Sequence, residues 1–172
     1  MNVSAGQSDA EPPAYLNQLA RTYRFLNRYR ARRTTSDMLA VEAFNDMEDF
    51  LWSFFQNCWH VNDWIRNDEQ LDRRLRERVW NEVKADRSLQ IVADLANGSK
   101  HLARSPNRER VGAAESQLSI NLNADGTYDF LHEVTLNDGS VLKADQIAVD
   151  AMRSWREILA KLGMYHYAEP SA

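Results

Sequence analysis

A carboxylate, two amides and an imidazole share one strip of the helix predicted between residues 89 and 102, and they could do acid–base chemistry together. The four residues recur at helical spacing: Gln90, Asp94, Asn97 and His101. An imidazole titrates near neutral pH, so His101 could act as general acid or base, with Asp94 and Asn97 orienting it. Alternatively, the same residues form a polar strip that faces water and is not a functional site. A histidine near a helix end also interacts favourably with the last carbonyl groups of that helix.

A second polar band lies opposite the apolar stripe of the helix predicted up to Ile65. It contains two indoles, an amide, an imidazole and a carboxylate: Trp52, Gln56, Trp59, His60 and Asp63. His60 and Asp63 could assist His101 in catalysis. Two tryptophans on one outer face predict a contact with another element or another protein. The carboxylates have a simpler interpretation as halves of ion pairs, with Arg66 and Arg87 close in the sequence.

Whether the two histidines meet depends on the chain between residues 71 and 102. In a straight helical hairpin His60 and His101 would lie about 40 Å apart. A kink at 86–88, with the sequence DRS, would fold the last segment back and bring them together. The pattern does not distinguish one bent helix from two.

The segment from residue 21 to residue 33 could bind RNA. It has arginines interleaved with aromatic residues, and Arg21, Arg24 and Arg28 are the candidate phosphate contacts. An alternative is internal neutralisation, because residues 37–49 contain five acidic residues and no basic one.

Composition excludes several classes of protein. The net charge of −4 gives no global attraction to nucleic acid or to an anionic membrane. The single cysteine, Cys58, allows no internal disulfide and no cysteine-rich zinc site, and a cytoplasmic location is expected. Its place on the apolar stripe predicts a buried, inert thiol. We expect no export signal, membrane span, metal site or cofactor, since no motif for any of these is present.

The apolar spacing predicts a mainly α fold, a bundle of about four or five helices with a small antiparallel β-meander before the C-terminal helix. Residues 1–13 are predicted as a disordered tail, 14–162 as one helical-bundle domain with the meander at 116–144, and 163–172 as a C-terminal tail. Glycines in the sequences ADG and NDG predict the turns of the meander, and Gly163 is expected to end the last helix.

Two stretches, CWHVNDWI and DLANGSKHL, followed by a strand region and a helix with Trp155, resemble a group of uncharacterised bacterial and phage-associated helical proteins over residues 50–160. The chain is more distantly similar to the HEPN superfamily, which includes RNA-cleaving toxins and defence proteins. Asn97 and His101 match the polar N-x3-H part of its motif. The arginine that HEPN nucleases place before the histidine is absent, because residues 94–96 are Asp, Leu and Ala.

Two functions are therefore expected as alternatives. The first is a non-enzymatic interaction protein, either a homodimer or a component of a toxin–antitoxin or phage-defence pair, with Trp52 and Trp59 in the contact surface. The second, implied by the resemblance, is a HEPN-like ribonuclease in which His101 is the general acid or base, Asp94 and Asn97 orient it, and His60 and Asp63 contribute from the preceding helix.

Overall fold

The computed structural model describes residues 13–37, 41–98, 117–136 and 138–164. These residues form five helices: α1 (Ala14–Arg32), α2 (Val41–Asn67), α3 (Arg73–Ala85), α4 (Arg87–Gly98) and α5 (Ala144–Lys161). They also form four strands: β1 (Thr34–Thr35), β2 (Gln117–Leu122), β3 (Tyr128–Thr135) and β4 (Val141–Lys143). The predicted fold class is confirmed, a mainly helical fold with a small antiparallel sheet before the C-terminal helix.

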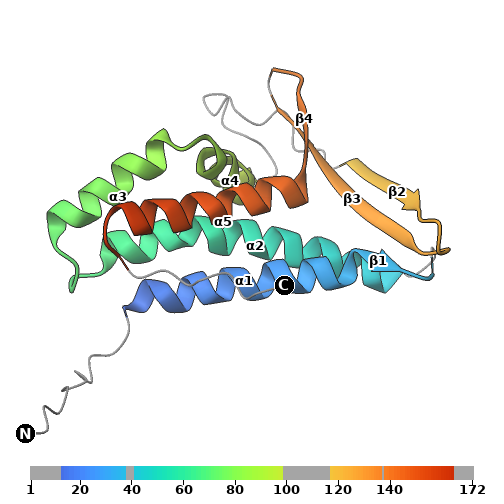
Figure 1. The fold of residues 1–172 in the computed structure, drawn as a ribbon, viewed down its shortest axis with the longest axis horizontal. Coiled ribbons are helices and arrows are strands. Elements are labelled where there is room, and N and C mark those ends of the chain that lie inside the picture. Colours follow the sequence, from blue (N-terminus) through green and yellow to red (C-terminus); the bar gives the residue numbers. More distant parts are fainter. Residues whose placement is uncertain (1–12, 38–40, 99–116, 137, 165–172) are drawn as a thin grey trace, which may run out of the picture.

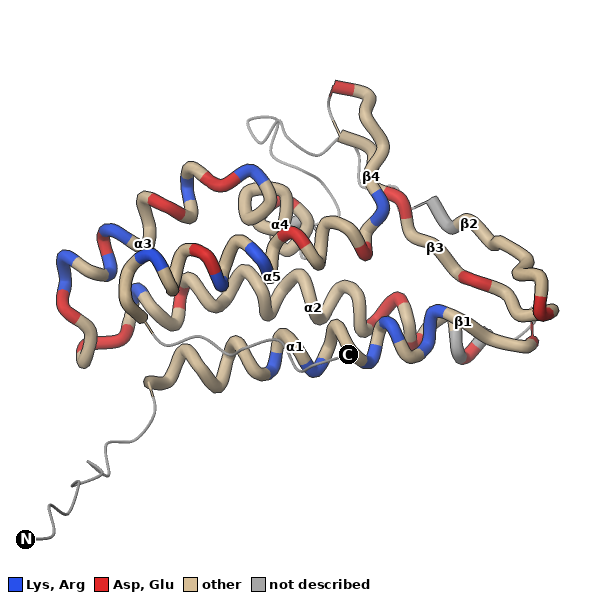
Figure 2. The backbone as a smooth tube through the Cα atoms, in the orientation of Figure 1, with Lys and Arg blue, Asp and Glu red and all other residues tan. Residues whose placement is uncertain are grey.

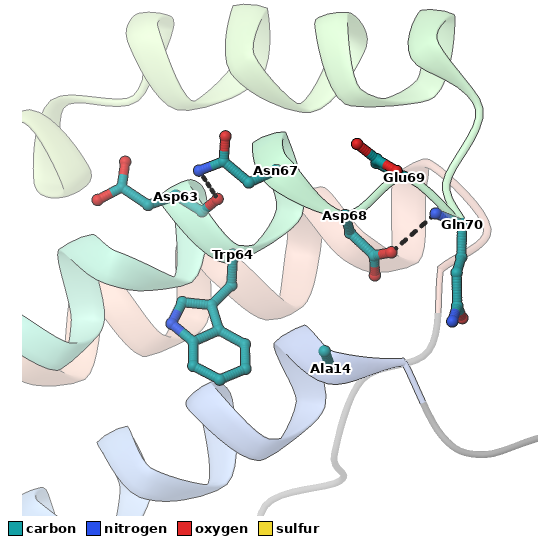
Figure 3. Close-up of a pocket in the computed structure, with 7 residues that line it drawn as sticks. All are labelled: Ala14, Asp63, Trp64, Asn67, Asp68, Glu69 and Gln70. Atoms are coloured by element: carbon teal, nitrogen blue, oxygen red, sulfur yellow. Dashed lines mark hydrogen bonds between the residues drawn. The ribbon is translucent and has the colours of Figure 1, made fainter.

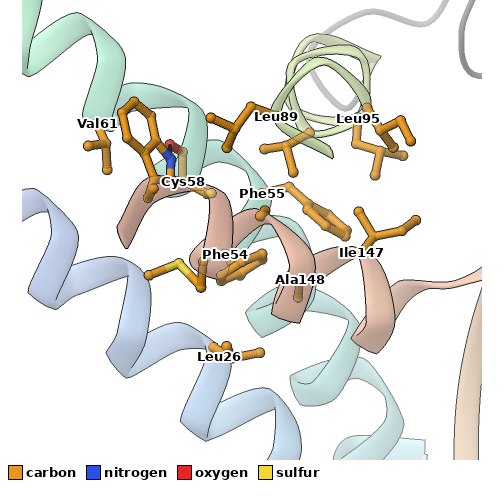
Figure 4. Close-up of a cluster of buried hydrophobic side chains, with 14 of the residues drawn as sticks. Leu26, Phe54, Phe55, Cys58, Val61, Leu89, Leu95, Ile147 and Ala148 are labelled. Atoms are coloured by element: carbon orange, nitrogen blue, oxygen red, sulfur yellow. Dashed lines mark hydrogen bonds between the residues drawn. The ribbon is translucent and has the colours of Figure 1, made fainter. Parts of the chain in front are cut away.

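The core is built around the apolar stripe of α2. Helices α1, α2 and α5 run along the long axis of the molecule, whereas α4 crosses them and is seen almost end-on (Figure 1). Side chains from α1, α2, α4 and α5 meet in one cluster (Figure 4). The stripe is fully buried from Met47 through Phe54 and Cys58 to Ile65, as the helical period predicts. None of the helices in the described ranges combines the length and apolar character that crossing a membrane requires.

The break predicted at 86–88 occurs at Asp86 and separates two helices. Asp86 has extended backbone angles, φ −83° and ψ 118°, and its N–H still bonds to Glu82 of α3. Its carboxylate accepts the backbone N–H of Leu89 at 2.8 Å, which caps the start of α4. One residue thus ends α3 and starts α4, and this is how α4 can cross the bundle.

Strand β3 is the centre of the sheet. It pairs with β2 along one edge and with both β1 and β4 along the other, always antiparallel. The meander was predicted, but β1 was not. Thr34 and Thr35 pair with Asp129 and Tyr128 of β3.

α5 ends close to Gly163, the residue that was predicted to end it. Gly163 has a φ of +68°, its N–H bonds to Ala160, and the N–H of Met164 bonds to Leu159. This is the Schellman arrangement, which requires a left-handed residue and so favours glycine. Met164 is buried behind it.

Candidate functional site

The outward face of α2, on the side away from α5, carries three of the five tryptophans of the chain. We define this face by six residues: Trp52, Gln56, Trp59, His60, Asp63 and Trp64. Trp64 is 39% exposed and the other five are half-buried. Trp155 shows the contrast, because its indole is fully buried and donates to the carbonyl oxygen of Cys58 at 3.2 Å.

Trp59 lies where α3 packs on α2. Its ring centroid is 6.4 Å from that of Trp80 on α3. The guanidinium of Arg66 and the ammonium of Lys84 lie over the Trp80 ring, at 4.6 and 5.4 Å from its centroid. Such cation–π contacts strengthen the packing of α3. One part of the prediction for Trp59 is therefore observed: the indole packs against another element of the same chain.

Trp52 stands one turn before the middle of the same face. Its ring meets that of Phe55 edge-on, with the centroids 6.0 Å apart, and its N–H points to a carboxylate oxygen of Glu48 at 3.5 Å. Both contacts lie within α2. The ring also packs against the hydrophobic core, and Trp52 remains half-buried.

An open hollow of about 650 Å³ lies at the C-terminal end of this face. Its lining comes from the start of α1, the end of α2 and the following loop: Ala14, Asp63, Trp64, Asn67, Asp68, Glu69 and Gln70. Figure 3 shows the indole of Trp64 between α2 and the first turns of α1. The first turns of α1 lie beside this indole, which is still 39% exposed. Trp64 was not among the residues that the sequence pattern singled out.

Some of the polar side chains that line the hollow form hydrogen bonds with the backbone of other lining residues. The Asn67 amide donates to the Asp63 carbonyl at 2.9 Å, and the Asp68 carboxylate accepts the Gln70 N–H at 3.0 Å. Asp63 is the one predicted catalytic residue in the lining, and no residue of α4 lines the hollow within the described chain.

The other predicted catalytic residues are placed as follows. Asp94 and Asn97 are half-buried on α4, and the Asn97 amide donates to the Ala93 carbonyl of its own helix at 2.6 Å. His60 is half-buried on α2. His101 lies outside the described residues, so its meeting with His60 stays a prediction, and so does ribonuclease activity.

The two arginines near Asp63 and Asp94 in the sequence each have a contact on another element. Arg66 lies over Trp80, as described above, and Arg87 pairs with Asp138 at 3.8 Å. Asp138 belongs to the turn before β4, which the sequence alone could not place beside α4. Surface pairs of this kind contribute little to stability.

The arginines of α1 divide into two groups. Arg32 pairs with Asp46 of α2, as internal neutralisation predicts, while Arg30 and Arg33 pair with Asp145 of α5. Arg21, Arg24 and Arg28 form a separate exposed stripe. The guanidinium of Arg28 lies over Phe25 and Phe50, and no carboxylate of the described residues pairs with Arg21 or Arg24. Figure 2 shows basic residues along α1. RNA binding there stays a prediction.

A buried histidine on β3 was not anticipated. His132 is 2% exposed, its ring stacks on Phe44 with the centroids 6.0 Å apart, and neither ring nitrogen has a hydrogen-bond partner in the described chain. Burial lowers the pKa of His132, and the Glu48 carboxylate partly opposes this. Strand alternation could have found it, since His132 shares a face with Phe130 and Val134.

Cys58 is buried against α5, as predicted, and burial raises its pKa to about 12. We expect native protein at pH 8 to react with iodoacetamide at least about 100-fold more slowly than unfolded protein, because the thiolate is the nucleophile and the thiol is covered. Mass spectrometry of aliquots quenched over time, with and without urea, measures both rates. Equal rates would contradict the buried position.

Among the described residues, no three histidine, cysteine or acidic side chains lie close enough together to hold a metal ion. Comparison of the chain with protein-family models, with curated proteins and with solved structures gave no match.

Proposed function

We propose that this chain is a non-enzymatic interaction protein and that the outward face of α2 binds another protein. The observation that carries this proposal is the presence of three tryptophans on that face, none of them fully buried. Indole rings are enriched in protein interfaces because they bury a large area at small entropic cost.

The surroundings of the tryptophans support a peptide or protein ligand. Trp64 stands beside an open hollow whose lining includes three carboxylates, those of Asp63, Asp68 and Glu69. An indole next to carboxylates is suited to a partner segment that combines an apolar anchor with basic residues. A role in a toxin–antitoxin or phage-defence pair is the finer form of this proposal.

The test compares two tryptophan variants with a matched control. The tagged chain is used to capture a partner, which is identified, purified and titrated against each variant. We expect Trp64→Ala and Trp52→Ala to weaken binding by about tenfold or more, since a hot-spot side chain contributes above about 1.4 kcal/mol. Trp59 is a poorer probe, because its removal also loosens α3.

The control is Val141→Ala on β4, where a 54% exposed apolar side chain lies on a different element. It should leave the affinity unchanged. Equal affinities for the wild type and both tryptophan variants would overturn the proposal, as would equal losses in the variants and the control.

A further inference from the structure

The outer edge of β2 is long and carries no charge. β2 runs for six residues with the sequence QLSINL, whereas the strands on the other side of β3 have two and three residues, and β4 contains Lys143. Figure 2 shows no acidic or basic residue on the described part of β2. Proteins usually protect such edges with charges, proline or short strands, and β2 has none of these protections.

The backbone groups at this edge can be assigned from the hydrogen bonds of the sheet. The N–H of Asn123 bonds to Thr127 across the hairpin, and the N–H of Phe130 bonds to Arg33 on the β1 side. Because Phe130 is opposite Ile120 in the register, Ile120 is a non-hydrogen-bonded position of the β2–β3 pair. The N–H and C=O groups of Leu118, Ile120 and Leu122 therefore point away from β3.

The side chains next to this edge are uncovered. Ile120 lies opposite Phe130 and so belongs to the same face of the sheet, the face that Phe44 and α5 cover on β3. Phe130 is 2% exposed, but Ile120 is 45% and Leu122 is 67% exposed. The helices therefore cover this face of the sheet at β3 but leave its side chains exposed at β2.

We propose that β2 pairs with β2 of a second copy of this chain, antiparallel about a two-fold axis at Ile120. This inference goes beyond the proposed function, since it concerns a different surface and a different partner. The segment Leu118 to Leu122 reads almost the same in both directions, so the axis places each Ile120 opposite its mate, Leu118 opposite Leu122, and Ser119 opposite Asn121.

This register satisfies the backbone and brings no like charges together. The N–H and C=O groups of Leu118, Ile120 and Leu122 on each strand bond to those of the second copy. This gives about six hydrogen bonds between the two chains. The exposed Ile120 and Leu122 side chains then continue one apolar row across both sheets. The pairing is closed, because each chain uses its only long edge in the described sheet, so a dimer and not a fibre results.

The mass of the full chain in solution, under reducing conditions, tests the proposal. Sedimentation velocity over about 5 to 200 µM is expected to show a species of twice the 19.9 kDa chain mass, with its fraction rising with concentration. Ile120→Lys should give monomer, because it places two ammonium groups opposite each other. Ile120→Pro should also give monomer, since it removes an N–H that β3 does not use.

Val141→Lys is the matched control, a lysine at a comparably exposed strand position away from the edge of β2. It should remain dimeric, as should Trp64→Ala and Trp52→Ala, so failure of this inference is distinguishable from failure of the proposed function. A wild-type monomer throughout the range would overturn the proposal. So would a dimer that both Ile120 variants retain, or one that Val141→Lys abolishes.

Amide hydrogen exchange tests the same pairing without any substitution. Raising the wild-type concentration should slow exchange at the N–H of Ile120 by at least several-fold, because that group gains a bond only in the dimer. The N–H of Asn121 points to β3 and should change little. Equal behaviour of the two amides would count against the edge pairing.

Discussion

Trp155→Ala is expected to lower the free energy of unfolding by about 3–5 kcal/mol, which is the usual range when a buried aromatic residue is truncated. The indole is fully buried between α5 and α2, and its N–H donates to the Cys58 carbonyl. The substitution leaves a large cavity and removes that hydrogen bond. Because domains of this size are stable by only about 5–15 kcal/mol, the loss is a large fraction of the total.

Urea unfolding followed by circular dichroism at 222 nm measures the effect, since this signal does not depend on the removed fluorophore. Trp64→Ala is the matched control, the same change at a 39% exposed position, and it should cost clearly less than Trp155→Ala. Trp155→Phe should fall between the two. Similar losses in Trp155→Ala and Trp64→Ala would show that the core is not centred on Trp155.

The second large effect is a loss of stability at acid pH caused by His132. Its pKa in the folded state is lowered by burial, so the unfolded chain binds more protons between that value and the ordinary value of about 6.5. The contribution of His132 to stability is complete above about pH 6.5 and decreases as the pH falls below it. One such group can change the free energy of unfolding by at most about 1.4 kcal/mol per pH unit.

The measurement is urea unfolding of wild type and His132→Leu between about pH 5.5 and 8, above the range where most carboxylates titrate. The difference between the two curves isolates His132, and we expect the variant to lack the decline below pH 6.5. Val141→Ala is the control, at an exposed position without an ionisable side chain, and it should keep the wild-type slope. A parallel decline in wild type and His132→Leu would contradict the role of His132.

The helices were predictable because each signal is local. The apolar stripe of α2, the break near Asp86 and the left-handed Gly163 each follow from residues within a few positions of one another. The turns of the meander were equally local, since Gly126 and Gly139 both have positive φ. Such features depend on backbone sterics and on the helical period, and both can be inferred from the types and spacing of nearby residues.

The candidate site was less predictable because it depends on contacts between distant segments. Arg87 pairs with Asp138, and Arg30 with Asp145, so in each case the partner is far along the chain. The hollow beside Trp64 is lined by residues from both α1 and α2. A helical wheel put Trp52 and Trp59 on one face of α2, but it could not say which ring would pack on Trp80.

Strand β1 has a consequence for the order in which the molecule can assemble. The hydroxyl of Thr34 bonds to the carboxylate of Asp129, a residue 95 positions later in the chain. During synthesis the end of α1 therefore leaves the ribosome long before its partner strand exists, and this part of the sheet must close over one of the longest loops in the protein. Contacts of such separation slow folding. The helical hairpin of α1 and α2 can form before the strand that pairs with β1 has been synthesised.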